Sequence, residues 1–265
     1  MLTFFRKIRK SLIESGSSRK YLLYAIGEIT LVVVGILIAL QINNWNEERK
    51  SNNRLKSHYH ELLEELTFDL EMINEHLINL ERIDQEGMYV RAFLQNSSEH
   101  VDTFRLIEAF LSAGYYAGFD ASRVAYDNLV NSGEINLIEN DELKRLLSVF
   151  HNPGGWNKRV DLGFVSQAIE EYHHYRYHFI EALLDRTHHH NLLLSKIYPE
   201  HFKQLEFHLE DFFIDWERLK SDSDYSIKLD KLHTARIDQK NLYFGMRKDI
   251  LKMIQIVEEE INRIG

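Results

Sequence analysis

Histidine is the side chain whose number and spacing point most directly to chemistry in this chain. Fourteen histidines occur in 265 residues, and several gather in the run EEYHHYRYHFIEALLDRTHHH, residues 170–190. On a helix, Glu171, His174 and His178 follow one another at spacings of three and four and share a face. Imidazole and carboxylate groups one turn apart are ligands of zinc and iron. The spacing therefore predicts a metal site at these three residues.

Two other interpretations of the histidine-rich run stay open. Carboxylate-bridged di-iron bundles use two Glu-x-x-His elements and two further glutamates, and no second helical stretch supplies them persuasively. The run is then a solvated helix face with packed tyrosines, or a surface that responds to pH because histidine titrates near neutrality. We assign no catalytic residue and no cofactor besides this zinc or iron.

The composition favours long helices and excludes several classes of protein. The chain has 12 Gly and 2 Pro, too few turn residues for a β-sandwich or barrel. It has no Cys, which excludes a disulfide scaffold and a thiol nucleophile. Glycine-rich phosphate motifs and a G-x-S-x-G turn are missing. The net charge is −9, with the acidic excess after residue 43, so nucleic acid is excluded as a partner.

Residues 21–42, YLLYAIGEITLVVVGILIALQI, form an apolar stretch whose only formal charge is Glu28. As a helix they would span about 33 Å, close to the hydrocarbon core of a bilayer. A cleaved signal peptide would have a shorter apolar region and a small-residue cleavage site, and a core helix would not explain the basic residues before it. The stretch predicts a transmembrane helix and makes the lipid bilayer a partner.

The flanking charges predict the orientation of this helix. Residues 1–20 carry six Lys or Arg against Glu14, whereas Glu47 and Glu48 follow the apolar stretch. The positive-inside rule places this leader in the cytoplasm and residues 43–265 on the other side, the periplasm of a cell with two membranes. The leader fits a basic amphipathic helix on the inner leaflet or a solvated segment. We expect a single-pass protein of the inner membrane.

One face of the predicted transmembrane helix carries Glu28, Gly35 and Ala39. Two small residues four apart let a second helix approach closely, and a protonated glutamate can form a hydrogen bond across such a pair. This face predicts a homodimer. The alternative is a carboxylate that reaches back to the lipid headgroups.

The pattern after Asn44 is helical, and no Gly or Pro occurs between Gly35 and Gly87. We therefore expect the transmembrane helix to continue to about residue 95, with a seam that packs within the chain or forms a dimeric coiled coil. The seam comprises Leu55, Tyr59, Leu62, Leu66, Leu70, Ile73, Leu77 and Leu80.

Further helices are expected after this one. The caps and breaks predict them at about 102–113 with Asp102 or Thr103 as N-cap, 121–131 with Asp120 or Ser122 as N-cap and Gly133 as its stop, 141–151 started by Asn140 or Asp141, 156–190, 199–219, and 235–263 capped by Thr234. The last helix has a seam at Leu242, Met246, Ile250, Met253 or Ile254, Val257 and Ile261. No strand is expected, so the fold class is all-α.

Two stretches carry a resemblance. They are KYLLYAIGEITLVVVGILIALQINNWNEERK, residues 20–50, and FDASRVAYDNLVNSGEINLIENDELKRLLSVFHN, residues 119–152. Both resemble a large family of uncharacterised single-pass membrane proteins of Gram-negative bacteria, classed as a domain of unknown function. The resemblance implies an anchored helical protein and supplies no activity or catalytic residue.

These observations lead to one main hypothesis and two alternatives. The main hypothesis is a membrane-anchored helical protein that works by binding, as a scaffold or a sensor with an unknown protein partner. The alternatives are an anchored metal enzyme that uses the Glu171, His174 and His178 face, and a structural envelope protein.

Overall fold

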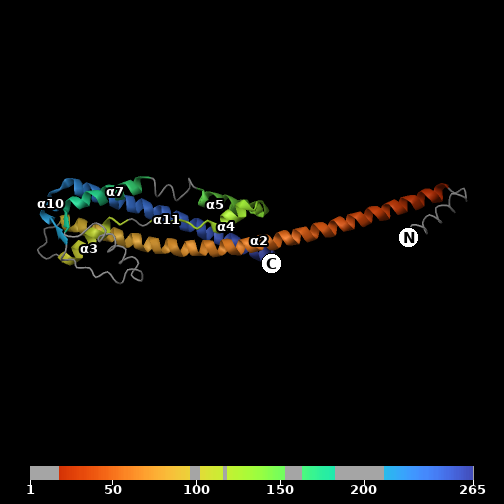
Figure 1. The fold of residues 1–265 in the computed structure, drawn as a ribbon, viewed down its shortest axis with the longest axis horizontal. Helices are drawn as coiled ribbons and strands as arrows, with labels where there is room; N and C mark the ends of the chain where they lie inside the picture. The colour runs from red at the N-terminus through yellow and green to blue at the C-terminus, as the bar shows by residue number, and fades with distance from the viewer. Residues whose placement is uncertain (1–17, 96–101, 116–117, 153–162, 183–211, 265) are drawn as a thin grey trace. The chain divides into compact units, whose positions relative to one another are not determined.

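A computed structural model describes residues 18–95, 102–115, 118–152, 163–182 and 212–264 (Figure 1). Within these ranges the all-α prediction is confirmed, with one pair of short strands added. The elements are α2 (Ser18–Gln95), α3 (Thr103–Ala113), α4 (Val124–Asn131), the 3₁₀ helix η1 (Glu134–Leu137), α5 (Asp141–His151), α7 (Phe164–Arg176), the 3₁₀ helix η2 (Tyr177–Phe179), β1 (Ile180–Ala182), β2 (Phe212–Ile214), α10 (Trp216–Ser221) and α11 (Ser223–Ile264). The chain divides into two compact units, Met1–Ser57 and His58–Gly265.

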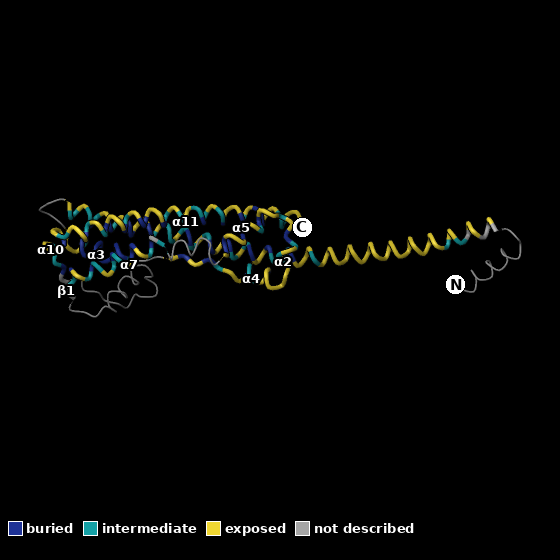
Figure 2. The backbone as a smooth tube through the Cα atoms, turned by 90° about the horizontal axis from the view of Figure 1, so that it is seen from above, coloured by how far each residue is buried: buried dark blue, intermediate teal, exposed yellow. Residues whose placement is uncertain are grey.

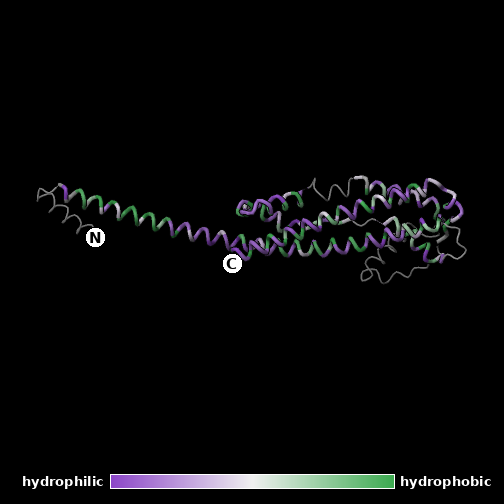
Figure 3. The backbone as a smooth tube through the Cα atoms, turned by 180° about the vertical axis from the view of Figure 1, so that it is seen from behind, coloured by the Kyte–Doolittle hydropathy of each residue, from purple (hydrophilic) through white to green (hydrophobic). Residues whose placement is uncertain are grey.

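Helix α2 is a single helix of 78 residues. Its end at Gln95 confirms the prediction of one helix that continues past the apolar stretch to about residue 95. The long interval without Gly or Pro explains this length, because every residue in it keeps its backbone hydrogen bond. In the first unit, all residues from Ile29 to Lys50 are exposed (Figure 2). The hydrophobic part of this exposed helix is green in Figure 3.

In the second unit, α2 buries one seam along its length. The positions alternate at spacings of four and three, the period of helices that pack at a shallow angle. Six of the eight predicted seam residues are buried, but Leu70 and Leu77 are only half-buried. The alternation places Asp69 and His76 in the seam instead. In the second unit it comprises Tyr59, Leu62, Leu66, Asp69, Ile73, His76, Leu80, Ile83, Gly87 and Val90, all of them buried except the half-buried His76.

Helix α11 runs antiparallel to α2 in this unit, as Figure 1 shows. The direction follows from three contacts between the helices: Arg91 pairs with Asp230, Lys240 with Glu81, and Arg247 with the Asn74 side chain. Helices α7 and α5 also pack against α11. The predicted α11 seam is buried at Met246, Ile250, Met253 and Val257 and half-buried at Leu242, Ile254 and Ile261.

Two short helices begin where the sequence predicts. The Asp102 side chain caps α3 by accepting the Arg105 N–H at 3.0 Å, and the Asn140 side chain caps α5 by accepting the Leu143 N–H at 3.0 Å. Both caps accept the N–H three residues later, which satisfies one of the first amides of the helix.

The start of α4 differs from its prediction. The helix begins at Val124 instead of residue 121, and neither Asp120 nor Ser122 is its N-cap. The Asp69 and Glu65 carboxylates of α2 accept hydrogen bonds from the amides of Ser122 and Ala125, so no local cap is needed. Its end is as predicted, because Gly133 follows the helix with φ +75°, a left-handed conformation that suits glycine.

The predicted helices at 156–190 and 199–219 are confirmed only in part where the structure describes them. Helix α7 and the start of α10 fall within the predicted ranges. The predictions are wrong after Arg176, where η2 follows and β1 pairs antiparallel with β2 through Ile180↔Ile214 and Ala182↔Phe212. The β2 residues, Phe212, Phe213 and Ile214, are aromatic and β-branched, which suits a strand. Residues 153–162 and 183–211 lie outside the described residues, and so do His188, His189 and His190.

The last helix starts earlier than predicted. Helix α11 begins at Ser223, and Thr234 lies inside it, where its hydroxyl donates to the Asp230 carbonyl at 3.0 Å. The Asp222 side chain accepts the Tyr225 N–H at 2.8 Å and takes the capping role. A core of α2, α3, α7, α10 and α11 residues surrounds Phe110, which packs against Trp216 and Tyr225.

Candidate functional site

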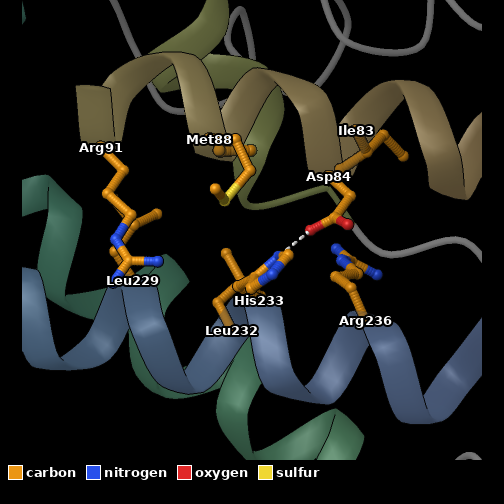
Figure 4. A pocket seen from close by; sticks show the side chains of 10 residues that line it. Ile83, Asp84, Met88, Arg91, Leu229, Leu232, His233 and Arg236 are labelled. Carbon is orange, nitrogen blue, oxygen red and sulfur yellow. Dashed lines mark hydrogen bonds and ion pairs between the residues drawn. The ribbon is translucent and has the colours of Figure 1, made fainter. Parts of the chain in front are cut away.

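A buried ionic cluster joins α2 to α11. Asp84, only 8% exposed, points from α2 toward His233, whose Nδ1 lies 2.7 Å from Asp84 Oδ1 (Figure 4). The Lys240 ammonium donates to Asp84 Oδ2 at 3.0 Å and to Glu81 at 2.9 Å. Burial works to lower the pKa of Lys240, and the hydrogen bonds to the two carboxylates outweigh it, so that this pKa lies above its ordinary value.

The cavity beside this cluster has a volume of about 10 Å³, which is room for about one water molecule. An aspartate that orients a histidine also occurs in general-base catalysis. Here the described residues that line the cavity include no hydroxyl and no thiol for the histidine to activate. The cluster therefore holds two helices together by charge and hydrogen bonding.

Two buried carboxylates of α2 hold the chain before and inside α4. Asp69 is fully buried and its Oδ1 accepts the Ser122 N–H at 3.1 Å, while Glu65 Oε2 accepts the Ala125 N–H at 2.7 Å. The second oxygen of each carboxylate is buried without a hydrogen-bond partner in the described structure. Burial raises the pKa of Asp69 to about 6 and also raises that of Glu65.

Two histidines of the second unit pack against aromatic rings. His151 is 3% exposed and stacks on Tyr126, with ring centroids 4.4 Å apart. Burial lowers its pKa to about 4, and neither ring nitrogen has a hydrogen-bond partner in the described residues. The His76 ring packs edge-on against Phe119 and Tyr243, and burial lowers its pKa too. Both are neutral near pH 7.

Two arginines are buried at the C-terminal end of α3. Arg176 Nη1 donates to the Leu111 carbonyl at 2.5 Å, and Arg236 Nη2 donates to the Tyr115 carbonyl. Each side chain is 1% exposed. The last carbonyls of a helix carry partial negative charge and have no partner within the helix. The Arg176 guanidinium satisfies one of them, and the Arg236 guanidinium satisfies the Tyr115 carbonyl just after the helix, which explains cations that are buried within the bundle.

The predicted metal residues lie on two elements. Glu171 and His174 are in α7, and His178 is in η2, because the α-helix ends between them. The Glu171 side chain accepts from Gln167 at 3.0 Å, and the ring Nδ1 atoms of His174 and His178 lie 2.9 Å from the backbone carbonyls of Glu170 and Tyr175.

Among the described residues, no group of three or more His, Asp or Glu side chains is placed so that it could hold a metal ion. The metal site stays a prediction. Metal analysis of the tag-free chain tests it, with His174→Ala plus His178→Ala as the control. A near-stoichiometric metal that this variant loses would support the site, and a wild-type content near zero would contradict it.

The predicted self-association face lies in the exposed part of α2. Gly35 and Ala39 are exposed and Glu28 is half-exposed. A methyl group added at Gly35 would meet nothing within 4 Å. The face is thus open in the single chain, and its pairing with a second copy stays a prediction.

A wide groove lies between α2 and α11 in the second unit. Its volume is about 640 Å³, and its walls include Leu77, Ile78 and Arg82 from α2, and Ile237 and Phe244 from α11. The ion pair of Lys240 with Glu81 also lines it. Large apolar side chains stand exposed in it, with Ile78 70% and Phe244 55% exposed. Such a patch is typical of surfaces that bind other proteins.

The polar positions of the seam were missed by the sequence prediction. Asp69 and His76 interrupt an apolar repeat, and the leucines beside them, Leu70 and Leu77, offered the expected residue type one position later. A strict alternation of four and three from Leu55 would have placed the polar residues inside. That alternation is the available signal, and the partners of these groups lie too far along the chain to show in it.

Residues 28–151 match the model of a family described as a family of unknown function, DUF6090. The match is consistent with the resemblance to a domain of unknown function. It spans the apolar stretch from Glu28 onward, the seam of α2 and helices α3 to α5, and it leaves out α7, α10 and α11. Searches of the curated proteins and of the solved structures give no match.

One helix of the described structure, from Ala25 onward, is long and apolar enough to cross a membrane. The chain is therefore a helical protein with one candidate membrane span near its N-terminus, similar over residues 28–151 to a family of unknown function.

Proposed function

We propose that the chain is a single-pass membrane protein that carries a helical bundle outside the cytoplasm and works by binding protein partners, which include further copies of itself, as a scaffold or a sensor. One observation carries this proposal. The most apolar window of the chain is entirely unburied, and it lies in the same unbroken helix that forms the seam of the second unit.

The exposure of the apolar window supports the membrane anchor. The core helix of a soluble protein buries its apolar side chains, whereas none of this window is buried. Leu31 is 75% exposed and Ile29 is 64% exposed. The transfer of each such side chain out of water is favourable by roughly 1.5–3 kcal/mol of free energy. A run of them therefore strongly favours insertion into a bilayer.

The groove between α2 and α11 supports a binding role. It presents Ile78 and Phe244 to solvent from two helices that the Asp84 cluster fixes against each other. Exposed aliphatic and aromatic groups on a rigid surface are the anchors that protein partners use. A scaffold or sensor needs such a surface.

Membrane extraction tests the anchor. Membranes from cells that express the full chain are washed with alkaline carbonate, and we expect the chain to stay in the pellet. Val33→Arg plus Ile36→Arg costs about 5–7 kcal/mol of insertion energy, so most of this variant should move to the supernatant.

Val130→Arg plus Val149→Arg is the matched control. Val130 and Val149 are each 43% exposed, close to the 47% of Val33, and lie outside the candidate span. This variant should stay in the pellet. Wild-type chain in the supernatant would contradict the anchor.

Co-purification tests the binding role. The full chain is isolated in mild detergent beside an Ile78→Lys plus Phe244→Lys variant, which charges the groove. Proteins bound through the groove should be recovered several-fold less with the variant. Recovery of the same proteins in the same amounts would contradict binding at this surface.

A further inference from the structure

The groove between α2 and α11 has features that identify one occupant. Resting on the proposed membrane anchor, we propose that it binds the same groove of a second copy of this chain, with α2 of each copy lying along α11 of the other. The two copies point in the same direction.

The spacing of apolar residues on α11 fits a long helical partner. Ile237, Phe244 and Leu251 recur every seven residues and are 41%, 55% and 41% exposed. A seven-residue repeat keeps one face of a helix against another that crosses it at a shallow angle. On α2, the heptad repeat links Ile78 and Gln85, which line the same groove.

The charges beyond the groove complement one another across two copies. Glu71 and Glu75 lie one heptad before Ile78 and Arg82, so they extend the α2 wall. Lys248 lies one heptad after Asn241 and extends the α11 wall.

All three side chains are exposed, and they form no ion pair in the described part of the chain. The contact of Arg247 with Asn74 puts Lys248 level with Glu71 and Glu75 on the antiparallel α2.

In a two-fold symmetric pair of parallel copies, the charged groups of one copy face those of the other. The pair lays α2 over the partner's α11 at the same level, so the apolar centre of one groove meets that of the other. The two glutamates then face the lysine of the second copy. An apolar centre with opposite charges at its edge is the usual composition of a specific interface.

The direction of the two copies follows from the level of the charges in the second unit. Lys248 lies level with Glu71 and Glu75, so a parallel pair with its two-fold axis along the helices brings the opposite charges of the two copies face to face.

Cysteine crosslinking tests this interface in the membrane, because the chain has no Cys of its own. Two differently tagged full-length copies are co-expressed, one with Ile78→Cys and the other with Phe244→Cys, and treated with a short bismaleimide. A crosslink between the tags can form only between copies. We expect it in several-fold excess over a Val130→Cys and Val149→Cys pair on α4 and α5.

Charge reversal makes the test specific for the proposed contact. Lys248→Glu in both copies should lower the crosslinked fraction several-fold, because it faces two glutamates. Adding Glu71→Lys plus Glu75→Lys should restore it. A loss without this rescue would overturn the proposed contact.

The remaining outcomes separate this inference from the proposed function. A chain that stays in carbonate-washed membranes but crosslinks no better than the control pair overturns the dimer and leaves the anchor intact. A crosslink to another protein instead of the second tag overturns a second copy as the occupant. A chain outside the membrane overturns the anchor and, with it, the dimer in the membrane that rests on it.

Discussion

Asp69 and His151 are buried titratable side chains that make stability depend on pH in opposite directions. Asp69 has a pKa of about 6 against an ordinary 3.8, so burial favours its neutral acid. His151 has a pKa of about 4 against an ordinary 6.5, so burial favours its neutral base. The stability that Asp69 contributes is present below pH 3.8 and is lost as the pH rises through 6. That of His151 is present above pH 6.5 and is lost as the pH falls through 4.

The two groups therefore oppose each other between about pH 4 and 6.5, and single variants should separate them. With His151→Phe, we expect the free energy of unfolding to rise by about 1–3 kcal/mol from pH 7 to pH 5. With Asp69→Asn, it should fall over the same range. Urea unfolding of the full chain in detergent at each pH measures both. Parallel pH curves for the two variants would contradict the opposition.

Gly114 is required because the Arg176 and Tyr172 side chains approach its Cα closely, and not because of its backbone conformation. A Cβ atom there would lie 2.8 Å from Arg176 Nη1 and 3.1 Å from Tyr172 Cδ1. We expect Gly114→Ala to lower the free energy of unfolding by about 1–3 kcal/mol, because the buried guanidinium cannot move away. Chemical denaturation measures the change.

Gly87→Ala is the control for this substitution. Its Cβ would meet Leu229 Cδ1 at 3.7 Å and Ala113 Cβ at 3.8 Å, which are ordinary contacts. Alanine also favours the helix by about 1 kcal/mol over glycine. The control should therefore be neutral or stabilising, and an equal loss at both positions would contradict the close-approach explanation.

At the scale of elements, helices were predictable where the cap is local. Asp102 and Asn140 cap α3 and α5 from the adjoining residue, and each was one of the two candidates that the sequence offered. The start of α4 was not, because its capping carboxylate, Glu65, lies 60 residues earlier. The end of α7 was missed for the same reason, since β1 pairs with a strand beyond residue 211.

Glu65 should stabilise the start of α4 in particular. We expect Glu65→Ala to cost about 1–2 kcal/mol, the value of a lost N-cap, and to speed hydrogen exchange at the Ala125 amide. Glu64→Ala removes an exposed neighbour on the same helix and is the control. Unchanged exchange at Ala125 in the Glu65 variant would show that the carboxylate does not hold the helix start.

At the scale of the whole molecule, the sequence predicted the long helix but not its polar contacts. The apolar stretch and the absence of breaks are local, so α2 could be traced through residue 95. The partners of Asp84, by contrast, are 149 and 156 residues away. No spacing rule links such positions, so the ionic cluster needed the folded chain.

The orientation across the membrane is also a property of the whole chain. With the basic leader in the cytoplasm, a periplasmically active reporter fused after residue 265 should be active, and a cytoplasmic reporter should not. Removing the positive charge, by replacing the six basic leader residues with Gln, should weaken the preference for this orientation. Cytoplasmic activity of the wild-type fusion would reverse the proposed localisation.

The antiparallel pairing of α2 with α11 sets the order in which this protein can be completed. The ribosome makes the seam of α2 first, and the chain that faces it, residues 223–264, emerges only after all the residues between the two helices. Until then, Tyr59, Leu66 and Ile73 have no α11 to pack against. Newly made protein must therefore carry an uncovered apolar strip while the intervening chain is made, a state prone to aggregation. Its yield in a cell should depend on a chaperone that holds this strip until α11 has emerged.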